Sequence, residues 1–328
     1  MAEQLNMAIA GVGRIGITHA AAMAQVENVK FMAVVDPNES LGREVAAKFG
    51  CDYYRSIPEL AARPDIAAVN ICVPEEHHLS AAKEAAAAGK HILIEKPLAK
   101  TFAESMEIID LAKAHGVRLM VAQTCRYVRQ YRKLRNEMQA GRIGELCQVC
   151  IRRFAPRGSM EYVKGRVSIL YYIGIHDLDA IQWVTGHKIT SVFARKLDKT
   201  DAYGEDGYSM LFTFDNGACG TMDLGWYFPA AYPGGLTKID IVGSEGVLFF
   251  DMMQEGISFY KEREQPVSPS FGYVDGRMVG AFVDMISGFS RCILDKEDFP
   301  EDTLDIAESI KVVEAVLRSA DSGLNEIV

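Results

Sequence analysis

The sequence has no long uninterrupted apolar run, and it is short of positive charge. Its 328 residues include 35 lysines and arginines against 44 aspartates and glutamates, which gives a net charge of −9. Charged residues or glycines break every apolar run, so we expect no bilayer-spanning helix. An acidic surface repels phosphate polymers and anionic lipid. We therefore expect neither nucleic acid nor a membrane as a partner.

Cysteine is also scarce. The seven residues are scattered along the chain: Cys51, Cys72, Cys125, Cys147, Cys150, Cys219 and Cys292. Cys147 and Cys150 form a lone C-x-x-C without a second pair or nearby histidines, so we expect buried or half-buried thiols and no metal. Residues 1–10 lack the basic start and long apolar core of a secretory signal. Together these features predict a cytoplasmic protein.

What the sequence does contain is enough apolar residues, 49% against 24% charged, for a packed chain of two domains. Over the first 125 residues, apolar segments alternate with helical patterns, which indicates βαβ units and a parallel sheet. The expected strands cover residues 5–10, 30–35, 67–73, 91–94 and 117–122, and the expected helices cover 15–26, 40–49, 79–88 and 102–115. Ser40 is the expected cap of the second helix.

After residue 131 the pattern changes to strand-like segments. The expected strands cover residues 146–154, 189–196, 208–214, 218–224, 236–242 and 247–250, and the expected helices cover 133–140, 174–184, 278–294 and 303–319. Residues 215–217, Asp-Asn-Gly, are a hairpin signal. We predict an α/β fold: an N-terminal Rossmann domain with a parallel doubly wound sheet (1–125), then a C-terminal α/β domain with a large, mostly antiparallel open sheet (126–328). The C-terminal helix can pack back on the Rossmann domain.

A glycine motif lies between the first expected strand and helix. Residues 11–16 read Gly-Val-Gly-Arg-Ile-Gly. Gly11 makes the tight turn, Gly13 lets a pyrophosphate approach the backbone, and Gly16 allows close packing of helix on strand. The motif, which includes Arg14 and Ile15, opens the expected helix, whose unpaired N–H groups then face the phosphates. The motif predicts a dinucleotide site.

Asp36 ends the second expected strand, 20 residues after Gly16. A carboxylate at this point accepts hydrogen bonds from the adenosine ribose and repels a 2′-phosphate, which favours NAD over NADP. Helix capping is the alternative role, and the two can coexist. Arg43 is close enough in sequence to rescue some NADP binding.

Two segments carry candidate catalytic residues. Lys96 follows a strand of the Rossmann half, where the carboxyl ends of strands face the ligand crevice, so its ammonium can hold a substrate oxygen. His176 begins a helix of the second half, and a histidine suits a general base near neutral pH. Asp179 lies three residues on and shares its helix face.

These motifs, in this order, resemble the glucose–fructose oxidoreductase / inositol 2-dehydrogenase / rhizopine catabolism (Gfo/Idh/MocA) family. They are residues 11–16, Pro74 with His78, Glu95-Lys96-Pro97, Arg126-Tyr127, Gly141 to Gly144, and Gly174-x-His176-x-x-Asp179. The resemblance covers nearly the whole chain. It implies an oxidoreductase that transfers a hydride between a sugar, inositol or related polyol hydroxyl and NAD(P), with a Rossmann domain followed by an α/β domain.

The resemblance also implies roles for particular residues. Lys96 looks like the catalytic lysine and His176 like the proton-transferring histidine. The cofactor-lining residues are then Gly11, Gly13, Arg14, Ile15, Gly16, Asp36, Cys72, Val73, Pro74, His78, Glu95, Lys96 and Arg126. The family's open sheet commonly forms the oligomer interface, and a long apolar sheet would expose a large patch in a monomer. We therefore expect a homo-oligomer, a dimer or tetramer, through the C-terminal sheet.

One position departs from the family's pattern. The family usually has an aspartate four residues before the histidine, and here that residue is Tyr172. A carboxylate would pair with the lysine and orient the histidine, whereas a phenol, with an ordinary pKa of about 10, stays neutral and can only hydrogen-bond or relay a proton. Tyr172 is therefore a candidate relay residue. Asp177 or Asp179 could supply the missing charge.

Other candidates for substrate contact are weaker. Tyr127 follows the last Rossmann strand. Arg153 and Arg166 can pair with a carboxylate or phosphate through the planar guanidinium, and a surface salt bridge is the alternative for each. The aromatic run 226–228 can stack on a sugar face, although core or interface packing is the more common use.

Two alternative functions remain open on the sequence. In the first, oxidation is transient and the reduced cofactor is reused in the same site, so that the net reaction is elimination, hydrolysis or epimerisation of a glycoside. In the second, the chain is a non-catalytic regulator that senses NAD and a sugar. Retention of both Lys96 and His176 argues against the regulator, because a sensor needs neither.

Overall fold

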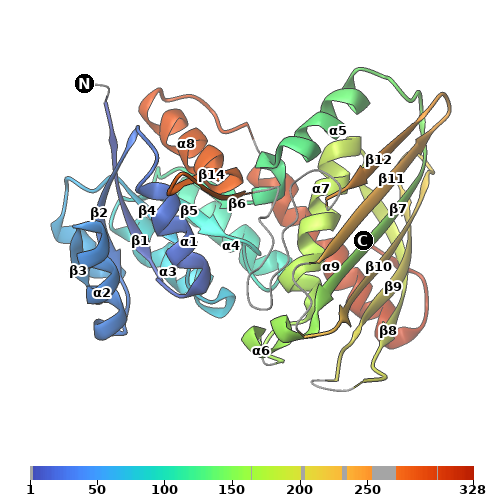
Figure 1. Cartoon of the computed structure of the whole chain (residues 1–328), viewed down its shortest axis with the longest axis horizontal. Helices are drawn as coiled ribbons and strands as arrows, with labels where there is room; N and C mark the ends of the chain where they lie inside the picture. The colour runs from blue at the N-terminus through green and yellow to red at the C-terminus, as the bar shows by residue number, and fades with distance from the viewer. Residues whose placement is uncertain (1–2, 164, 201–203, 231–234, 253–270, 301) are drawn as a thin grey trace. The chain divides into compact units, whose positions relative to one another are not determined.

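The computed structural model of the chain describes residues 3–163, 165–200, 204–230, 235–252, 271–300 and 302–328 (Figure 1). The chain divides into two compact units. One contains Met1–Tyr127 and Tyr273–Glu308, and the other contains Val128–Gly272 and Ser309–Val328. The chain therefore leaves the first unit, builds most of the second, returns to the first at Tyr273 and ends in the second.

The first unit is built on a six-stranded sheet in the order β3-β2-β1-β4-β5-β6. Its strands are β1 (Leu5–Ala10), β2 (Val29–Val35), β3 (Asp52–Tyr54), β4 (Ala68–Ile71), β5 (His91–Glu95) and β6 (Leu119–Ala122), and its helices include α1 (Arg14–Met23), α2 (Glu39–Phe49), α3 (His78–Ala87) and α4 (Phe102–Ala114). Every strand pair is parallel. This is the doubly wound order of a Rossmann fold, which confirms the predicted class.

The start of α2 differs from the prediction. Asn38, rather than Ser40, is the N-cap, and its side-chain oxygen accepts a hydrogen bond from Leu41 N at 3.2 Å. Ser40 is the second residue inside the helix. Asparagine and serine cap equally well, so the residue type did not decide between them, and the position of the turn after Asp36 did.

The returning segment also differs from the prediction. Residues 278–280 were expected to begin a helix, but they belong to strand β14 (Arg277–Gly280), which pairs with β13 (Phe271–Val274). Helix α8 (Ala281–Leu294) starts only after Gly280, whose φ of +97° few other residues tolerate. The glycine therefore sets the helix start.

The second unit is built on a seven-stranded sheet in the order β12-β11-β7-β10-β9-β8-β15. Its strands are β7 (Leu146–Pro156), β8 (Ile189–Leu197), β9 (Gly207–Phe214), β10 (Cys219–Phe228), β11 (Leu236–Gly243), β12 (Val247–Asp251) and β15 (Glu326–Ile327). The β7–β10 pair is parallel, and the other pairs are antiparallel. The mostly antiparallel sheet and the hairpin at 215–217 are as predicted, whereas the short β15 was missed.

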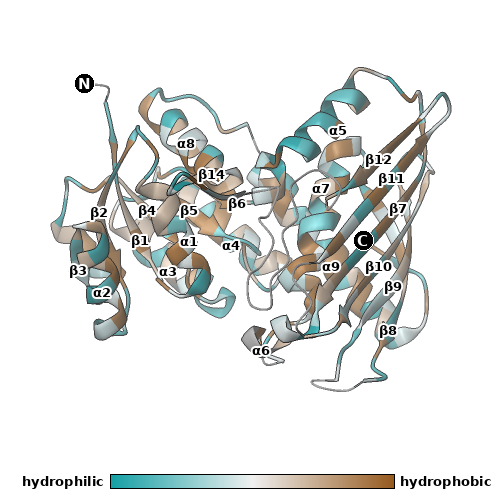
Figure 2. Ribbon diagram, viewed as in Figure 1, coloured by the Kyte–Doolittle hydropathy of each residue, from teal (hydrophilic) through white to brown (hydrophobic). Residues whose placement is uncertain are grey.

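Helices α5 (Arg129–Gln139), α7 (Ile175–Thr185) and α9 (Thr303–Ser322) accompany this sheet, and a short α6 (Met160–Val163) follows β7 (Figure 1). Figure 2 shows hydrophobic colour along the strands and hydrophilic colour over much of α5. Alternate strand residues such as Phe212 and Met222 are buried, while Leu211 and Phe249, from the intervening set, are 49% and 76% exposed. One face of the sheet thus forms the core of the unit.

Candidate functional site

The glycine turn between β1 and α1 has the geometry that a dinucleotide requires. Gly11 has a φ of +86°, and a Cβ there would lie 2.7 Å from Cys72 O. A Cβ on Gly16 would lie 2.0 Å from Gly11 O, so the helix and strand touch at this point. A Cβ on Gly13 would meet nothing within 4 Å, and Gly13 offers no side chain to cap α1. The backbone at Gly13 is therefore open to the close approach of a pyrophosphate, at a helix start that is suited to bind an anion.

Asp36 stands beside that turn at the end of β2 and is 7% exposed. Its Oδ2 accepts from Val12 N at 2.9 Å and its Oδ1 accepts from Asn38 N at 2.9 Å. A carboxylate has about four lone-pair positions, so two remain for the hydroxyls of a ribose. Arg43 Nε forms an ion pair with Glu39 Oε1 at 2.8 Å, and the Arg43 guanidinium carbon lies 5.0 Å from the centroid of the Tyr53 ring. The turn and the carboxylate together fit NAD.

Lys96 follows β5, whose carboxyl end lies at the same edge of the parallel sheet as the glycine turn. Glu95 precedes it. The Oε2 atom of Glu95 accepts from Lys96 N at 3.1 Å, and its Oε1 atom lies 2.8 Å from Nε2 of His19. Burial by itself raises the pKa of Glu95, but the His19 hydrogen bond and the nearby Lys96 charge hold that pKa below its usual range. Glu95 is thus a buried carboxylate kept ionised.

The loops after β4 and β5 are joined by His78, which is 1% exposed. Its Nδ1 lies 2.9 Å from Pro97 O and 3.2 Å from Leu98 O, and its Nε2 lies 3.1 Å from Val73 O. Burial lowers the pKa of His78 and raises that of Cys72, whose thiol donates to Asn70 Oδ1 at 3.5 Å. His78 therefore contacts backbone carbonyls, a role that its sequence position did not indicate.

Arg126 and Tyr127 form a 3₁₀ turn (Thr124–Tyr127) after β6, and each is 3% exposed. The Tyr127 hydroxyl lies 3.9 Å from Met120 Sδ, and its ring faces Gly288 of α8. Gln123, just before this turn, is fully buried, and neither amide atom has a hydrogen-bond partner among the residues that the structure describes. Gln123 is a polar residue that sequence reasoning missed.

In the second unit, His176 lies in the first turn of α7, directly after a π-helical turn (Leu170–Gly174) that contains Tyr172. The Tyr172 ring packs against Trp226 of β10, with ring centroids 5.6 Å apart. Trp226 is 2% exposed, so the Tyr172 ring packs against a buried side chain. A π-helical turn is frequent at functional sites because it shifts side chains relative to an α-helix.

The charged residues near His176 contact other side chains of the second unit. Asp177 is fully buried, its Oδ2 lies 3.6 Å from Arg153 Nε, and its Oδ1 accepts from Tyr131 Oη at 3.3 Å. Arg153 also donates to the Thr237 hydroxyl. Burial raises the pKa of Asp177, and Arg153 opposes the shift.

Asp179 and Arg166 are two further residues that the sequence predicts as substrate contacts. Asp179 is 1% exposed and accepts from Ser309 Oγ of α9 at 3.3 Å. Arg166 is exposed. Neither observation assigns a substrate contact.

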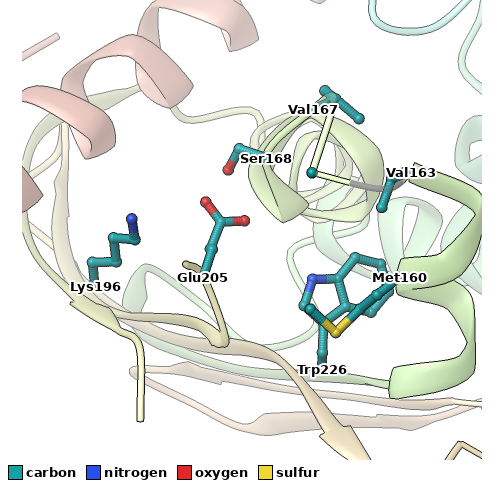
Figure 3. A pocket seen from close by; sticks show the side chains of 8 residues that line it. Met160, Val163, Val167, Ser168, Lys196, Glu205 and Trp226 are labelled. Atoms are coloured by element: carbon teal, nitrogen blue, oxygen red, sulfur yellow. The ribbon is translucent and has the colours of Figure 1, made fainter. Parts of the chain in front are cut away.

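A pocket in the second unit was also missed by sequence reasoning (Figure 3). It is a hollow of about 130 Å³ that opens to solvent, which is smaller than the roughly 300–1,000 Å³ of a typical small-molecule site. Its lining residues are Met160, Val163, Gly165, Val167, Ser168, Lys196, Glu205 and Trp226. Glu205 accepts from Ile169 N at 2.6 Å and from Tyr208 Oη at 2.9 Å. The Glu205 carboxylate thereby anchors the start of the π-helical turn.

Within the described residues, no group of three or more histidines, cysteines, aspartates or glutamates is arranged to hold a metal ion. Cys150 is half-buried as expected, but Cys147 is exposed and lies where the register of β7 against β11 shifts, without a partner residue on β11. None of the described helices is long and apolar enough to cross a membrane.

Comparison with known proteins defines the class. Residues 5–123 match the model of an oxidoreductase family with an NAD-binding Rossmann fold, GFO_IDH_MocA, and residues 131–249 match a GFO/IDH/MocA C-terminal domain. Together with the glycine turn and Asp36, this makes the chain an NAD-binding oxidoreductase. It belongs to the Gfo/Idh/MocA family.

Several relatives are named for inositol. The chain is 28% identical to a myo-inositol 2-dehydrogenase of Thermotoga maritima over 76% of each protein, and 26% identical to an inositol 2-dehydrogenase of Rhizobium meliloti over 96% of each. The fold is similar to that in a crystal structure of scyllo-inositol dehydrogenase from Lactobacillus casei with NAD(H) and scyllo-inositol. The two chains superpose with a TM-score of 0.84 over 99% of each, at 19% sequence identity. The last similarity concerns the fold alone.

Proposed function

We propose that this enzyme oxidises a hydroxyl of an inositol, sugar or related polyol, with Lys96 holding the reacting oxygen and His176 as the general base. The observation that carries the proposal is the position of Lys96. It follows β5 at the sheet edge that also bears the glycine turn and Asp36, and its backbone is bonded to a buried, ionised Glu95. Relatives named inositol 2-dehydrogenase support the substrate class.

The bound NAD supplies the hydride acceptor, and the protein supplies position and charge. The Lys96 ammonium donates a hydrogen bond to the substrate oxygen and stabilises the negative charge that develops there. His176 accepts the hydroxyl proton. Tyr172 stands where the family has an aspartate, and its hydroxyl relays a proton or orients the substrate through hydrogen bonding. Its packing against Trp226 supports a fixed orientation.

The cofactor contacts that we propose are those predicted from the sequence, with Asp36 as the residue that selects NAD. For the substrate we retain Lys96, Tyr172 and His176 as direct contacts. The other predicted contacts, Tyr127, Arg153, Arg166 and Asp179, stay predictions. Arg153 is the weakest of them, because its guanidinium already contacts Asp177 and Thr237.

The test is a panel of polyols and sugars, with NADH formation as the readout. The wild type is expected to reduce NAD with at least one inositol isomer. Lys96→Met should lower turnover by about a thousandfold, since removal of one charge-stabilising donor typically costs a factor of about 10²–10³, while NAD affinity stays within about threefold. Lys100→Met is the matched control, because Lys100 is an exposed lysine of the same loop region that pairs only loosely with Glu76 at 3.8 Å. Full turnover in Lys96→Met would refute the assigned role.

A second function, redox-neutral cycling, has a specific observation in its favour. The chain is 24% identical over 299 residues to a 2,7-anhydro-N-acetylneuraminate hydratase of Mediterraneibacter gnavus. The replacement of the family's aspartate by Tyr172 also points to altered proton handling. Product formation from a glycoside without release of NADH would favour this function over net oxidation.

Self-association through the C-terminal sheet is also part of the proposal. Leu211, Val247 and Phe249 are 49%, 45% and 76% exposed on strands of that sheet. Apolar side chains gathered on an open sheet face favour burial against a second copy. Sedimentation of the wild type as a dimer or tetramer, and of Leu211→Lys/Phe249→Lys as a smaller species, would support the interface; a monomeric wild type would refute it. The cytoplasm is the compartment that we propose for the assembly.

A further inference from the structure

His19 is a buried titratable residue to which neither the sequence nor the family comparison assigned a role. It lies on α1, three residues after Gly16, and it is fully buried. Its Nε2 is 2.8 Å from Glu95 Oε1, and its Nδ1 is 2.9 Å from Asn70 Nδ2 on β4. One imidazole thus joins α1 to the middle of β4 and to the end of β5.

The partners determine how His19 is protonated. The Asn70 amide nitrogen can only donate, so Nδ1 of His19 accepts and carries no proton. The proton therefore lies on Nε2, which donates to Glu95. A neutral imidazole of this tautomer satisfies both hydrogen bonds without bringing a second charge into the core. It orients one carboxylate oxygen and leaves the negative charge on Glu95.

Glu95 in turn constrains the backbone of the next residue, Lys96. Its other oxygen accepts from Lys96 N at 3.1 Å, so the carboxylate holds the backbone from which the Lys96 side chain extends. His78 holds the following residues through the carbonyls of Pro97 and Leu98. The titratable groups that lower the pKa of Glu95 are His19 from α1, Lys96 itself and His78 from α3. Glu95 in turn raises the pKa of the Cys72 thiol after β4.

We propose that His19 is a positioning residue for Lys96, acting through Glu95 to fix the lysine backbone and to keep one carboxylate beside its ammonium. This inference rests on the proposed function, since it assumes that Lys96 works on the substrate.

The test compares His19→Leu with His19→Gln in the full-length enzyme with NAD and the most active polyol of the panel. Leucine removes the donor to Glu95, and kcat should fall by about 10- to 100-fold, the value of one hydrogen bond to a charged group. Glutamine keeps an N–H donor on a side chain of similar reach, and kcat should return to within about threefold of wild type. NAD affinity, measured by calorimetry, should stay within about threefold of the wild-type value in both variants, because His19 lies outside the glycine turn.

A pH profile separates positioning from a merely structural role. Without the His19 donor, burial raises the pKa of Glu95, so the carboxylate takes up a proton at a higher pH. The acidic limb of the kcat profile should therefore move to higher pH in His19→Leu and stay in place in His19→Gln. His91→Gln is the matched control. His91 begins β5, the strand that ends at Glu95, and its Nδ1 accepts from Arg118 N at 3.1 Å.

One combination of results supports the inference, and the others overturn it. Selective loss of kcat in His19→Leu, with the shifted limb and rescue by glutamine, supports the inference. Unchanged kcat, or an equal loss of kcat, NAD affinity and thermal stability in both variants, overturns it. If Lys96→Met keeps full turnover, the proposed function fails and takes this inference with it; if Lys96→Met is inactive and His19→Leu is not impaired, the inference alone fails.

Discussion

The buried ion pair between Arg153 and Asp177 allows a quantitative prediction for the C-terminal unit. Asp177 is fully buried, and the Arg153 side chain is 18% exposed. At their 3.6 Å separation, two unit charges attract by about 4–5 kcal/mol at an effective dielectric constant of ~20. Removing one partner of a buried pair typically costs about 3–5 kcal/mol, because the other charge stays desolvated. We therefore predict that Arg153→Met lowers the free energy of unfolding by about 3–5 kcal/mol at pH 8.

The same pair predicts how the loss depends on pH. Burial raises the pKa of Asp177 above its value in the unfolded chain, so the folded state binds the proton more tightly. Stability then decreases as pH rises through the folded-state pKa, because the ionised carboxylate is the costly form. Arg153 opposes this rise in pKa, so its removal extends the effect to higher pH. The loss in Arg153→Met should be largest at pH 8 and shrink toward acidic pH, where Asp177 is protonated.

Urea unfolding of the wild type and variants across this pH range is the measurement. Arg153→Met/Asp177→Asn, which removes both charges, should recover at least about 2 kcal/mol of the loss and should lose the pH dependence. A loss below about 1 kcal/mol, as for an exposed pair, would refute the reasoning. So would an equal loss at every pH, because protonation of Asp177 would then play no part.

Two further predictions concern the N-terminal unit. Asp36→Ala should weaken NAD binding by about tenfold or more, since hydrogen bonds to a charged group are lost, while NADP binding weakens less; calorimetric titration of both nucleotides checks this, and an equal loss for both would contradict ribose recognition. Gln123→Leu should stabilise the protein by about 1–3 kcal/mol, because an apolar side chain of similar size replaces a buried amide that has no hydrogen-bond partner in the described part of the chain. A lower melting temperature in that variant would show that the amide is paired.

The sequence predicted the architecture well because the signals were periodic. Near-continuous apolar strands such as residues 5–10 are covered on both faces, and they proved to be parallel. Local details were less predictable. Asn38 and Ser40 are both capping residues, and only the path of the chain after Asp36 selects Asn38. Residues 278–280 are compatible with a helix, and pairing with β13 makes them a strand.

The site was predictable where motifs act through the backbone, and less so where side chains meet across the fold. Gly11 and Gly16 are constrained by local approach distances that the motif encodes. His19 has no such signal, because its partners Asn70 and Glu95 are distant in sequence and meet it only in the folded unit. Arg153 could not be assigned for the same reason: its partner Asp177 comes from another element.

Hydride transfer from a polyol carbon is the central claim, and a single-turnover experiment with a deuterated substrate tests it most directly. The enzyme is mixed with NAD and scyllo-inositol carrying deuterium on its ring carbons, then denatured, and the extracted cofactor is analysed by mass spectrometry. The account predicts deuterium on the reduced cofactor in the wild type, and its appearance about a thousandfold more slowly in Lys96→Met. Cofactor without deuterium in the wild type, for this inositol and for every other deuterated polyol of the panel, would contradict it.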